Sequence, residues 1–301
     1  MDVSVIIVNY NSGDYIEECL CSIYENTKNV KFEIIVVDNA SSDDSIEKIG
    51  REFPDIICIR LPKNIGFGAA NNIGANIAKG MCLFFLNPDT IIINNSIDIL
   101  YDYLKCNCNV ALCGGNLYKE NLEPNRSYSL SIVKPLDALL SVFNVNREKA
   151  DEYFNKSDKA KSVAWIVGAD MMIRKDIFEE IGQFDIEFFM YKEELDISMR
   201  IYPKYEIHSV STAKIIHKEG GCSGSKEFDR ETHFIYLDSE IRFVKKYYYG
   251  CFFVISFLYI LKSIFGYLLY FLLNNKRKKK YWLRNLETVI GTFQPQKNTR
   301  L

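Results

Sequence analysis

Cysteine and histidine patterns that hold zinc are missing from this chain of 301 residues. It contains only three histidines, and no Cys-x-x-Cys pair is formed by the closely spaced cysteines at 19, 21, 106, 108 and 113. A cysteine-rich zinc site is therefore not expected. The sequence also shows no basic segment followed by an apolar leader at its start. That absence predicts a reducing cytoplasm, in which the nine cysteines remain free thiols.

An excess of one charge is missing as well. The 37 lysines and arginines nearly balance the 39 aspartates and glutamates, so the formal net charge is −2, and a nucleic-acid-binding polycation is excluded. Charge is concentrated only in Lys-Arg-Lys-Lys-Lys at 276–280. This block favours an anionic surface as partner, with an ordinary solvated run as the alternative.

Apolar strands alternate with helices in the first third of the chain. Strands are predicted over 3–8, 33–37, 56–61 and 81–86, and helices over 16–24, from about 41, and over about 69–78. This rhythm predicts an α/β fold with a doubly wound, mostly parallel sheet. Such sheets bind ligands at the carboxyl ends of their strands. Four polar residues follow strands there, namely Asn9, Asp38, Asn64 and Asp89.

The pattern after residue 110 is less regular. We predict a polar helix over 144–161, strands over 165–169 and 171–173, a short helix over 176–181 closed by Gly182, a helix over 193–201, one or two strands over 207–216, and a longer helix over 229–248.

Residues 251–273 are almost entirely apolar, and only Lys262 and Ser263 interrupt them. Their length would span a bilayer. The central Lys262 and the basic block that follows favour a helix lying in the membrane interface, or a hairpin dipping into it. The alternative is a helical cap buried against the rest of the chain or in a homodimer.

Four segments carry residues suited to chemistry. Asp89 directly follows a buried strand, where a carboxylate suits Mg²⁺ or Mn²⁺ that also binds phosphate oxygens; a Pro-Asp turn is the alternative. The two glycines of 63–72 would let the backbone approach a ligand before a helix N-terminus, although their spacing does not fit a dinucleotide fingerprint. His217 stands between an apolar strand and the Gly-Gly turn at 220–221 and is a candidate metal ligand.

The fourth segment, 188–196, places three carboxylates after a run of aromatic residues. Glu193, Glu194 and Asp196 cannot share one helical face, so some of them are expected at the surface or in a cap. A partly desolvated carboxylate here would act as a general base. His208 and His233 lack a comparable setting and are predicted to be structural.

Seven motifs in this order resemble the family-2 glycosyltransferases of the GT-A fold, in particular a bacterial branch with rhamnosyltransferase-like members. They are Val5–Asn11, Val36–Ser41, Asn64–Gly68, Leu86–Asp89, Gly182–Asp185, Glu193–Asp196 and His217. The resemblance covers residues 3 to about 246. It implies a catalytic domain over 1–246, with a nucleotide-binding half (1–110) and an acceptor-binding half (111–246), followed by a helical and basic extension over 247–301.

The resemblance also implies roles for particular residues. It assigns the metal to Asp89 with His217, the catalytic base to Glu194 beside Glu193, and the nucleotide sugar to Asn9, Tyr10, Asp38, Asn64, Gly66, Phe67, Gly68, Asn71 and Asn87. Two positions depart from the family pattern. Asn87 replaces the first aspartate of an Asp-x-Asp motif and is the weaker ligand. Glu194 stands where aspartate is usual, which leaves the choice between Glu193 and Glu194 open.

The predicted function is an inverting, metal-dependent transfer by an enzyme of the hexosyltransferase class. A sugar would pass from a nucleotide-diphosphate donor, dTDP-rhamnose or a UDP-sugar, to a saccharide in cell-surface polysaccharide synthesis. The apolar segment favours a lipid-linked acceptor and a cytoplasmic enzyme, peripheral on the inner face of the membrane through 251–280. Trp165 and Asp170 are candidate acceptor-binding residues, although a tryptophan of this kind also suits a core.

Two other classes remain open at this point. A nucleotidyltransferase would share the nucleotide and the metal, but the chain lacks a glycine- and lysine-rich phosphate loop near its start. A non-catalytic glycan-assembly protein of the same fold would have no need of the retained carboxylates.

Overall fold

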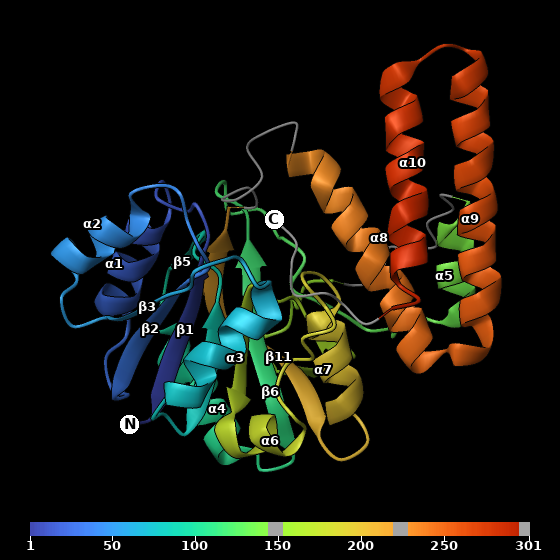
Figure 1. Ribbon diagram of the computed structural model, residues 1–301. Coiled ribbons are helices and arrows are strands. Elements are labelled where there is room, and N and C mark those ends of the chain that lie inside the picture. Colours follow the sequence, from blue (N-terminus) through green and yellow to red (C-terminus); the bar gives the residue numbers. More distant parts are fainter. Residues whose placement is uncertain (144–152, 219–227, 295–301) are drawn as a thin grey trace.

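The computed structural model describes residues 1–143, 153–218 and 228–294 (Figure 1). Within these residues, nine strands form one sheet in the order β3-β2-β1-β4-β10-β6-β11-β5, with β8 paired to β11. Its strands are β1 (Val3–Asn9), β2 (Phe32–Asp38), β3 (Ile57–Arg60), β4 (Cys82–Leu86), β5 (Thr90–Ile92), β6 (Val110–Tyr118), β8 (Lys161–Ser162), β10 (Asp170–Arg174) and β11 (Glu206–His217). A separate two-stranded ladder pairs β7 (Tyr128–Ser129) with β9 (Trp165–Ile166).

The predicted doubly wound, mostly parallel sheet is confirmed, with antiparallel strands added by the second half of the chain. Strands β1, β2, β3 and β4 pair in parallel, and β11 is parallel to β6. In contrast, β10 runs antiparallel between β4 and β6, and β5 runs antiparallel to β11. Residues on both sides of position 110 therefore build one continuous sheet.

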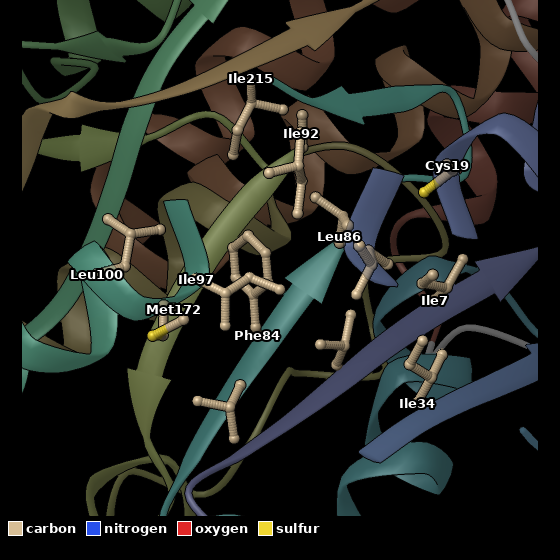
Figure 2. Packing of buried hydrophobic residues seen from close by; sticks show 14 of the residues in the cluster. Ile7, Cys19, Ile34, Phe84, Leu86, Ile92, Ile97, Leu100, Met172 and Ile215 are labelled. Atoms are coloured by element: carbon tan, nitrogen blue, oxygen red, sulfur yellow. The ribbon is translucent and has the colours of Figure 1, made fainter. Parts of the chain in front are cut away.

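Helices cover both faces of this sheet. One face packs against α1 (Ile16–Asn26), α2 (Ser45–Glu52) and α4 (Ser96–Cys106), and the other against α3 (Phe67–Ile77), α6 (Lys175–Glu180) and α7 (Glu193–Ile201). Figure 2 shows the first of these two cores, where side chains such as Ile7 and Phe84 have no exposed surface. Burying one such side chain stabilises the fold by about 1.5–3 kcal/mol.

The predicted helix over 144–161 is wrong in its second part, and 144–152 lie outside the described residues. From 153 to 161 the chain is irregular and ends in the short strand β8. The Asn155 side chain accepts a hydrogen bond from the Ser157 backbone and donates one to the Lys159 carbonyl (3.0 and 2.8 Å). Such side-chain to backbone hydrogen bonds compete with helix formation.

Three helices follow the sheet and stand beside it: α8 (Phe228–Tyr247), α9 (Tyr249–Leu272) and α10 (Lys276–Gly291). In Figure 1, α9 and α10 form an antiparallel hairpin. The turn that joins them lies toward the top of the view, as does the start of α8. The helices meet closely, because a Cβ added to Gly266 of α9 would lie 2.3 Å from the ring of Trp282 in α10. The basic block 276–280 forms the first residues of α10.

Helix α9 has two apolar faces with different surroundings. Phe252, Ile255 and Tyr259 pack against α8 and against α5 (Pro135–Ser141). Lys262 lies on this inner face, where its ammonium group donates to the carbonyl of Val142 (2.6 Å). The outer face is exposed, so the alternative of a wholly buried cap does not hold for the chain as described.

Candidate active site

Asn9 and Asp38, which end two neighbouring parallel strands, are paired in register and bonded to each other. The Asn9 amide donates to Asp38 Oδ1 (2.8 Å) and to the hydroxyl of Ser45 (2.7 Å). Both predicted residues are buried, while Tyr10 beside them is partly exposed. These hydrogen bonds hold Asn9 and Asp38 at the carboxyl ends of β1 and β2, the edge of the sheet at which parallel strands bind ligands.

Asn39 connects this edge to the glycine-containing loop after β3. Its amide nitrogen donates to Asn64 Oδ1 (2.9 Å), and its amide oxygen accepts from the Ile65 backbone (2.9 Å). Asn64 in turn accepts from the Gly66 backbone (3.0 Å). Asn39 had no assigned role in the sequence interpretation. Only its position beside Asp38 at a strand end could have pointed to it.

The glycines at 66 and 68 are required by packing within the protein. Gly66 has a φ of +94°, and a Cβ there would lie 2.3 Å from the carbonyl oxygen of Phe189. The Phe67 backbone donates to that same oxygen (2.8 Å), and a Cβ on Gly68 would lie 3.0 Å from Phe184. The backbone N–H of Phe67, at the start of this helix, is therefore used within the protein and not offered to a ligand.

The helix after these glycines also clamps the loop that leads to the acidic segment. Asn72 both donates to the carbonyl of Phe184 (2.8 Å) and accepts from its backbone nitrogen (3.0 Å). Asn71 is buried and donates to the carbonyl of Phe67 (3.1 Å). Residues 64–72 thus hold the segment 184–192 in place, which the sequence did not reveal.

Asp89 and His217 meet at the edge of the sheet. Strand β5 begins at Thr90 and pairs with the end of β11, which sets His217 opposite Thr90. The His217 Nε2 atom lies 3.4 Å from Asp89 Oδ1 and 3.5 Å from the Asn87 amide nitrogen. Both Asp89 and His217 are nearly buried, with side-chain exposures of 11% and 13%.

Two protein ligands fit a cation that shares its coordination with phosphate oxygens. Among the described residues, no group of three or more histidine, cysteine, aspartate or glutamate side chains is placed to hold a metal. Mg²⁺ commonly binds through one or two carboxylates together with substrate phosphates and water. Asp89 and His217 therefore suit such an ion only in company with a diphosphate.

Glu193 and Glu194 begin α7 and face different surroundings. Glu193 is buried, with 6% of its surface exposed, and its Oε2 finds no hydrogen-bond partner among the described residues. Burial and then the charge of Glu194 raise the pKa of Glu193 well above its ordinary value. Asp196, on the next turn, is fully buried against Arg200, Lys246 and Tyr247. The expectation of surface or capping carboxylates is thus wrong for Glu193 and Asp196.

Glu194 is partly buried and lines a cavity of about 820 Å³. Burial raises its pKa, and its own backbone N–H together with the charges of Lys192 and Arg126 offset that rise only in part. A Cβ added to Gly168 would lie 3.9 Å from the Glu194 Cβ, and the carbonyl of the next residue, Ala169, accepts from the Asn87 backbone (3.0 Å). Residues 168–169 therefore lie between Glu194 on one side and Asn87, close to Asp89, on the other.

Trp165 and Asp170 are placed differently with respect to this cavity. Trp165 lines it, and its indole N–H donates to the Ser131 carbonyl (3.3 Å). Asp170 has no exposed surface, and its Oδ2 accepts from the Gly115 backbone (2.6 Å). Burial raises the pKa of Asp170 well above its usual range. Asp170 is not among the residues that line the cavity.

Comparisons with known proteins agree with this architecture. Residues 4–182 match Glycosyl transferase family 2. An uncharacterised glycosyltransferase of Rickettsia prowazekii is 30% identical over 227 residues, which cover 71% of this chain and 64% of that protein. An N-acetylglucosaminyl-diphospho-decaprenol L-rhamnosyltransferase of Mycobacterium tuberculosis is 22% identical over 73% of this chain and 77% of its own length.

A solved structure supports the fold. GalNAc-T7, crystallised with UDP, GalNAc and Mn²⁺, matches 81% of this chain and 48% of its own with a TM-score of 0.60 at 18% identity. The GT-A fold implied by the sequence motifs is therefore confirmed, and the relatives include a rhamnosyltransferase, as the resemblance implied. With more than half of its residues matched, the chain belongs to glycosyl transferase family 2.

Proposed function

We propose that this glycosyltransferase moves a sugar from a nucleoside diphosphate to a membrane-borne saccharide, with Glu194 as the general base. The observation that carries the proposal is the position of Glu194 on the cavity wall, one short segment away from Asp89 and His217. Glu193 is the poorer candidate, because its carboxylate is enclosed by protein.

The reaction is a single displacement. Glu194 takes the proton of an acceptor hydroxyl, the oxygen attacks the anomeric carbon, and the bond from that carbon to the diphosphate oxygen breaks. A raised pKa suits this step, since a stronger base accepts the proton of a hydroxyl more readily. A divalent cation held by Asp89 and His217 would supply charge neutralisation to the leaving diphosphate. The donor would be dTDP-rhamnose or, as the second candidate, a UDP-sugar.

The hairpin supports a membrane-borne acceptor. One stripe of α9 carries exposed apolar side chains at 253, 254, 257, 261, 264, 265 and 268, a spacing that keeps them on a single helical face. Phe265 is 70% and Leu272 80% exposed. By length and composition α9 is long and apolar enough to cross a membrane, but its inner face packs on α5 and α8.

The charges next to this stripe favour an anionic bilayer surface. Lys276, Arg277, Lys278 and Lys280 are exposed at the start of α10, directly after the apolar stripe ends. An amphipathic surface with apolar and cationic parts is typical of proteins that lie in the interface of an anionic membrane. We therefore propose that the outer face of α9 rests in the bilayer interface while the basic turn binds its headgroups.

The experiment is a paired substitution, Glu194→Gln and Glu193→Gln, in the full chain. Labelled dTDP-rhamnose and UDP-sugars are incubated with a membrane lipid extract, and sugar transfer is measured beside donor binding. We expect Glu194→Gln to reduce transfer by about 10²-fold or more, the scale of a lost general base, with donor binding kept. Glu193→Gln should retain more transfer. Equal transfer by Glu194→Gln and the unaltered enzyme would sink the assignment.

A further inference from the structure

The two residues that precede Glu193 and Glu194 have an unusual backbone conformation. Tyr191 and Lys192 have φ angles of +71° and +72°, in the left-handed region that residues other than glycine rarely adopt. Such a conformation persists only where the surrounding structure imposes it. This turn also decides the direction in which α7 begins, because Lys192 is the N-cap of that helix. Contacts from another part of the chain must therefore hold it.

Helix α8 supplies contacts to both of these side chains. The Lys192 ammonium group lies 2.6 Å from a carboxylate oxygen of Glu240 and donates to the Tyr236 hydroxyl (3.2 Å). The ring of Tyr191 meets the ring of Tyr236 edge-on, with their centroids 5.8 Å apart. A single helix therefore engages the two strained residues together.

The same face of α8 also holds the backbone of the turn. The Ser239 hydroxyl donates to the carbonyl of Met190 (2.8 Å). Tyr236, Ser239 and Glu240 are three and four positions apart along the helix, a spacing that brings side chains together on one helical face. The turn 190–192 is thus fixed by this one face of α8, at its side chains and at its backbone.

The pair formed by Lys192 and Glu240 is poorly suited to stability alone. Both side chains are nearly buried, with exposures of 11% and 5%. Removing two charges from water costs about as much as their attraction returns, so apolar side chains of similar size often stabilise a protein equally well. An ion pair differs in that it also fixes a distance and a direction, whereas hydrophobic contact is non-directional. The pair therefore suits a role in geometry.

Glu194 is the side chain whose direction matters most at this turn. It lines the cavity, whereas Glu193 is enclosed by protein with 6% of its surface exposed. Successive residues are about 100° apart around a helix, so a modest change in the turn would move Glu194 away from the cavity wall. Lys192 lines the same cavity, but its ammonium group is engaged by α8.

We propose that Lys192 is a positioning residue for Glu194. Held by Glu240 of α8, it keeps the turn 190–192 in the conformation that directs Glu194 into the cavity. This inference rests on the proposed function, because it takes Glu194 as the base. It adds that α8, the helix on which the hairpin packs, takes part in arranging the catalytic group.

The double variant Lys192→Met, Glu240→Leu separates position from stability in the full chain. Its apolar pair should restore much of the stability that Lys192→Met alone loses in urea unfolding. Turnover should not return with it. We expect kcat to stay about tenfold or more below that of the unaltered enzyme, with KM for the nucleotide sugar unchanged, because a misplacement of about 1 Å can cost about 10²-fold. Lys192→Arg, which keeps the charge, should restore part of kcat.

Two controls separate positioning from other effects. Leu104→Ala removes a buried side chain of α4, on the opposite face of the sheet, and should lower stability without changing kcat. In a Glu194→Gln background, the double variant should cause little further loss, because residues that act through one group are not additive. Losses that multiply in this background would show that Lys192 acts on the substrate itself, and would overturn the proposal.

Hydrogen exchange of the backbone amides provides a measurement that needs no transfer. The amides of 189–194 should exchange faster in the double variant than in the unaltered chain, while those of β4 stay unchanged. Unchanged exchange in 189–194, or full kcat in the folded double variant, would overturn the proposal while Glu194→Gln remains impaired. Normal transfer by Glu194→Gln would instead overturn the base and, with it, this role of Lys192. The exchange rates would still show whether α8 holds the turn.

Discussion

The ammonium group of Lys192 lies 2.6 Å from a carboxylate oxygen of Glu240 and 3.2 Å from the hydroxyl of Tyr236. This pair joins the residue before α7 to the middle of α8. Burial alone would lower the pKa of Lys192, but the charge of Glu240 and the contact with Tyr236 raise it above its ordinary value. The loop that presents Glu194 is thereby fastened to the helix that carries the hairpin.

Removing one partner of this pair should cost more than removing both. Lys192→Met leaves the Glu240 carboxylate buried without its counter-charge, which destabilises a protein by about 3–5 kcal/mol. The double variant Lys192→Met, Glu240→Leu should recover much of that loss. Urea unfolding of the single and double variants measures the difference. A double variant no more stable than Lys192→Met would contradict the view of an isolated buried pair.

The pH dependence of transfer should report the environment of Glu194. The base works ionised, so kcat/KM falls as the pH drops through the Glu194 pKa. Because burial raises that pKa, the fall should be centred above about 4.3, the ordinary value for glutamate. Arg126→Gln removes a charge that lowers the pKa, so its midpoint should lie at still higher pH than that of the unaltered enzyme.

The matched control for this profile is Arg51→Gln, whose midpoint should not move. A midpoint in Arg126→Gln that stays unchanged or moves to lower pH would contradict the effect of the Arg126 charge on the titrating group. A kcat/KM profile without an acidic limb above about pH 4.3, the ordinary pKa of glutamate, would argue against a carboxylate base of raised pKa.

The sequence predicted the strands that place Asp38, Asp89 and His217 because their patterns are local. Each is a buried run followed by a polar residue, and the carboxyl ends of such strands converge in any doubly wound sheet. The contact of Asp89 with His217 also followed from the family motifs. Helix α7 begins and ends at the predicted residues, Glu193 and Ile201.

The pairing of distant segments could not be read from the sequence. The reason for Gly66 is the carbonyl of Phe189, which lies far along the chain, so local reasoning assigned the glycine to a ligand instead. The burial of Asp196 depends on Lys246 and Tyr247 of α8. Likewise, Lys262 was interpreted as an interfacial charge, while its partner is a carbonyl at the end of α5.

Gly66→Ala tests this reading of the glycine loop. A positive φ strains a residue with a side chain by about 1–3 kcal/mol, and the added Cβ would also overlap the Phe189 carbonyl. We therefore expect a lower free energy of unfolding and weaker transfer, because the loop before Glu194 must shift. Gly50→Ala is the control: its Cβ meets open space in α2, and alanine favours a helix by about 1 kcal/mol over glycine. An equally stable Gly66→Ala would refute the packing argument.

Substitutions of Asp89 and of its neighbours His217 and Asn87 should weaken the binding of a divalent metal to different degrees. In the presence of a nucleoside diphosphate, Asp89→Asn and His217→Ala should each weaken Mn²⁺ binding by at least about tenfold, the scale on which even outer-shell partners act. Asn87→Ala should weaken it less, since its amide is the poorer ligand. Titration calorimetry measures all three. Unchanged Mn²⁺ affinity in Asp89→Asn would remove this residue from the metal site.

Substitutions on the hairpin test the bilayer proposal without unfolding it. Deleting 251–301 would uncover the α8 side chains that pack on Phe252 and Ile255, so point changes on the outer face are cleaner. Phe265→Glu with Leu268→Glu should abolish sedimentation with vesicles of any lipid, because each buried apolar side chain contributes about 1.5–3 kcal/mol.

Charge reversal at Lys276, Arg277 and Lys280 should act only on anionic vesicles. Each basic residue near such a surface contributes about 1 kcal/mol, so binding to phosphatidylglycerol vesicles should fall while the weaker binding to phosphatidylcholine persists. Arg51→Glu, on the exposed side of α2, should change neither. If the unaltered chain ignores vesicles but forms a dimer that Phe265→Glu dissociates, the outer face of α9 is a protein interface. The lipid-linked acceptor would then lose its structural support, while the cavity and the role of Glu194 would stand unaffected.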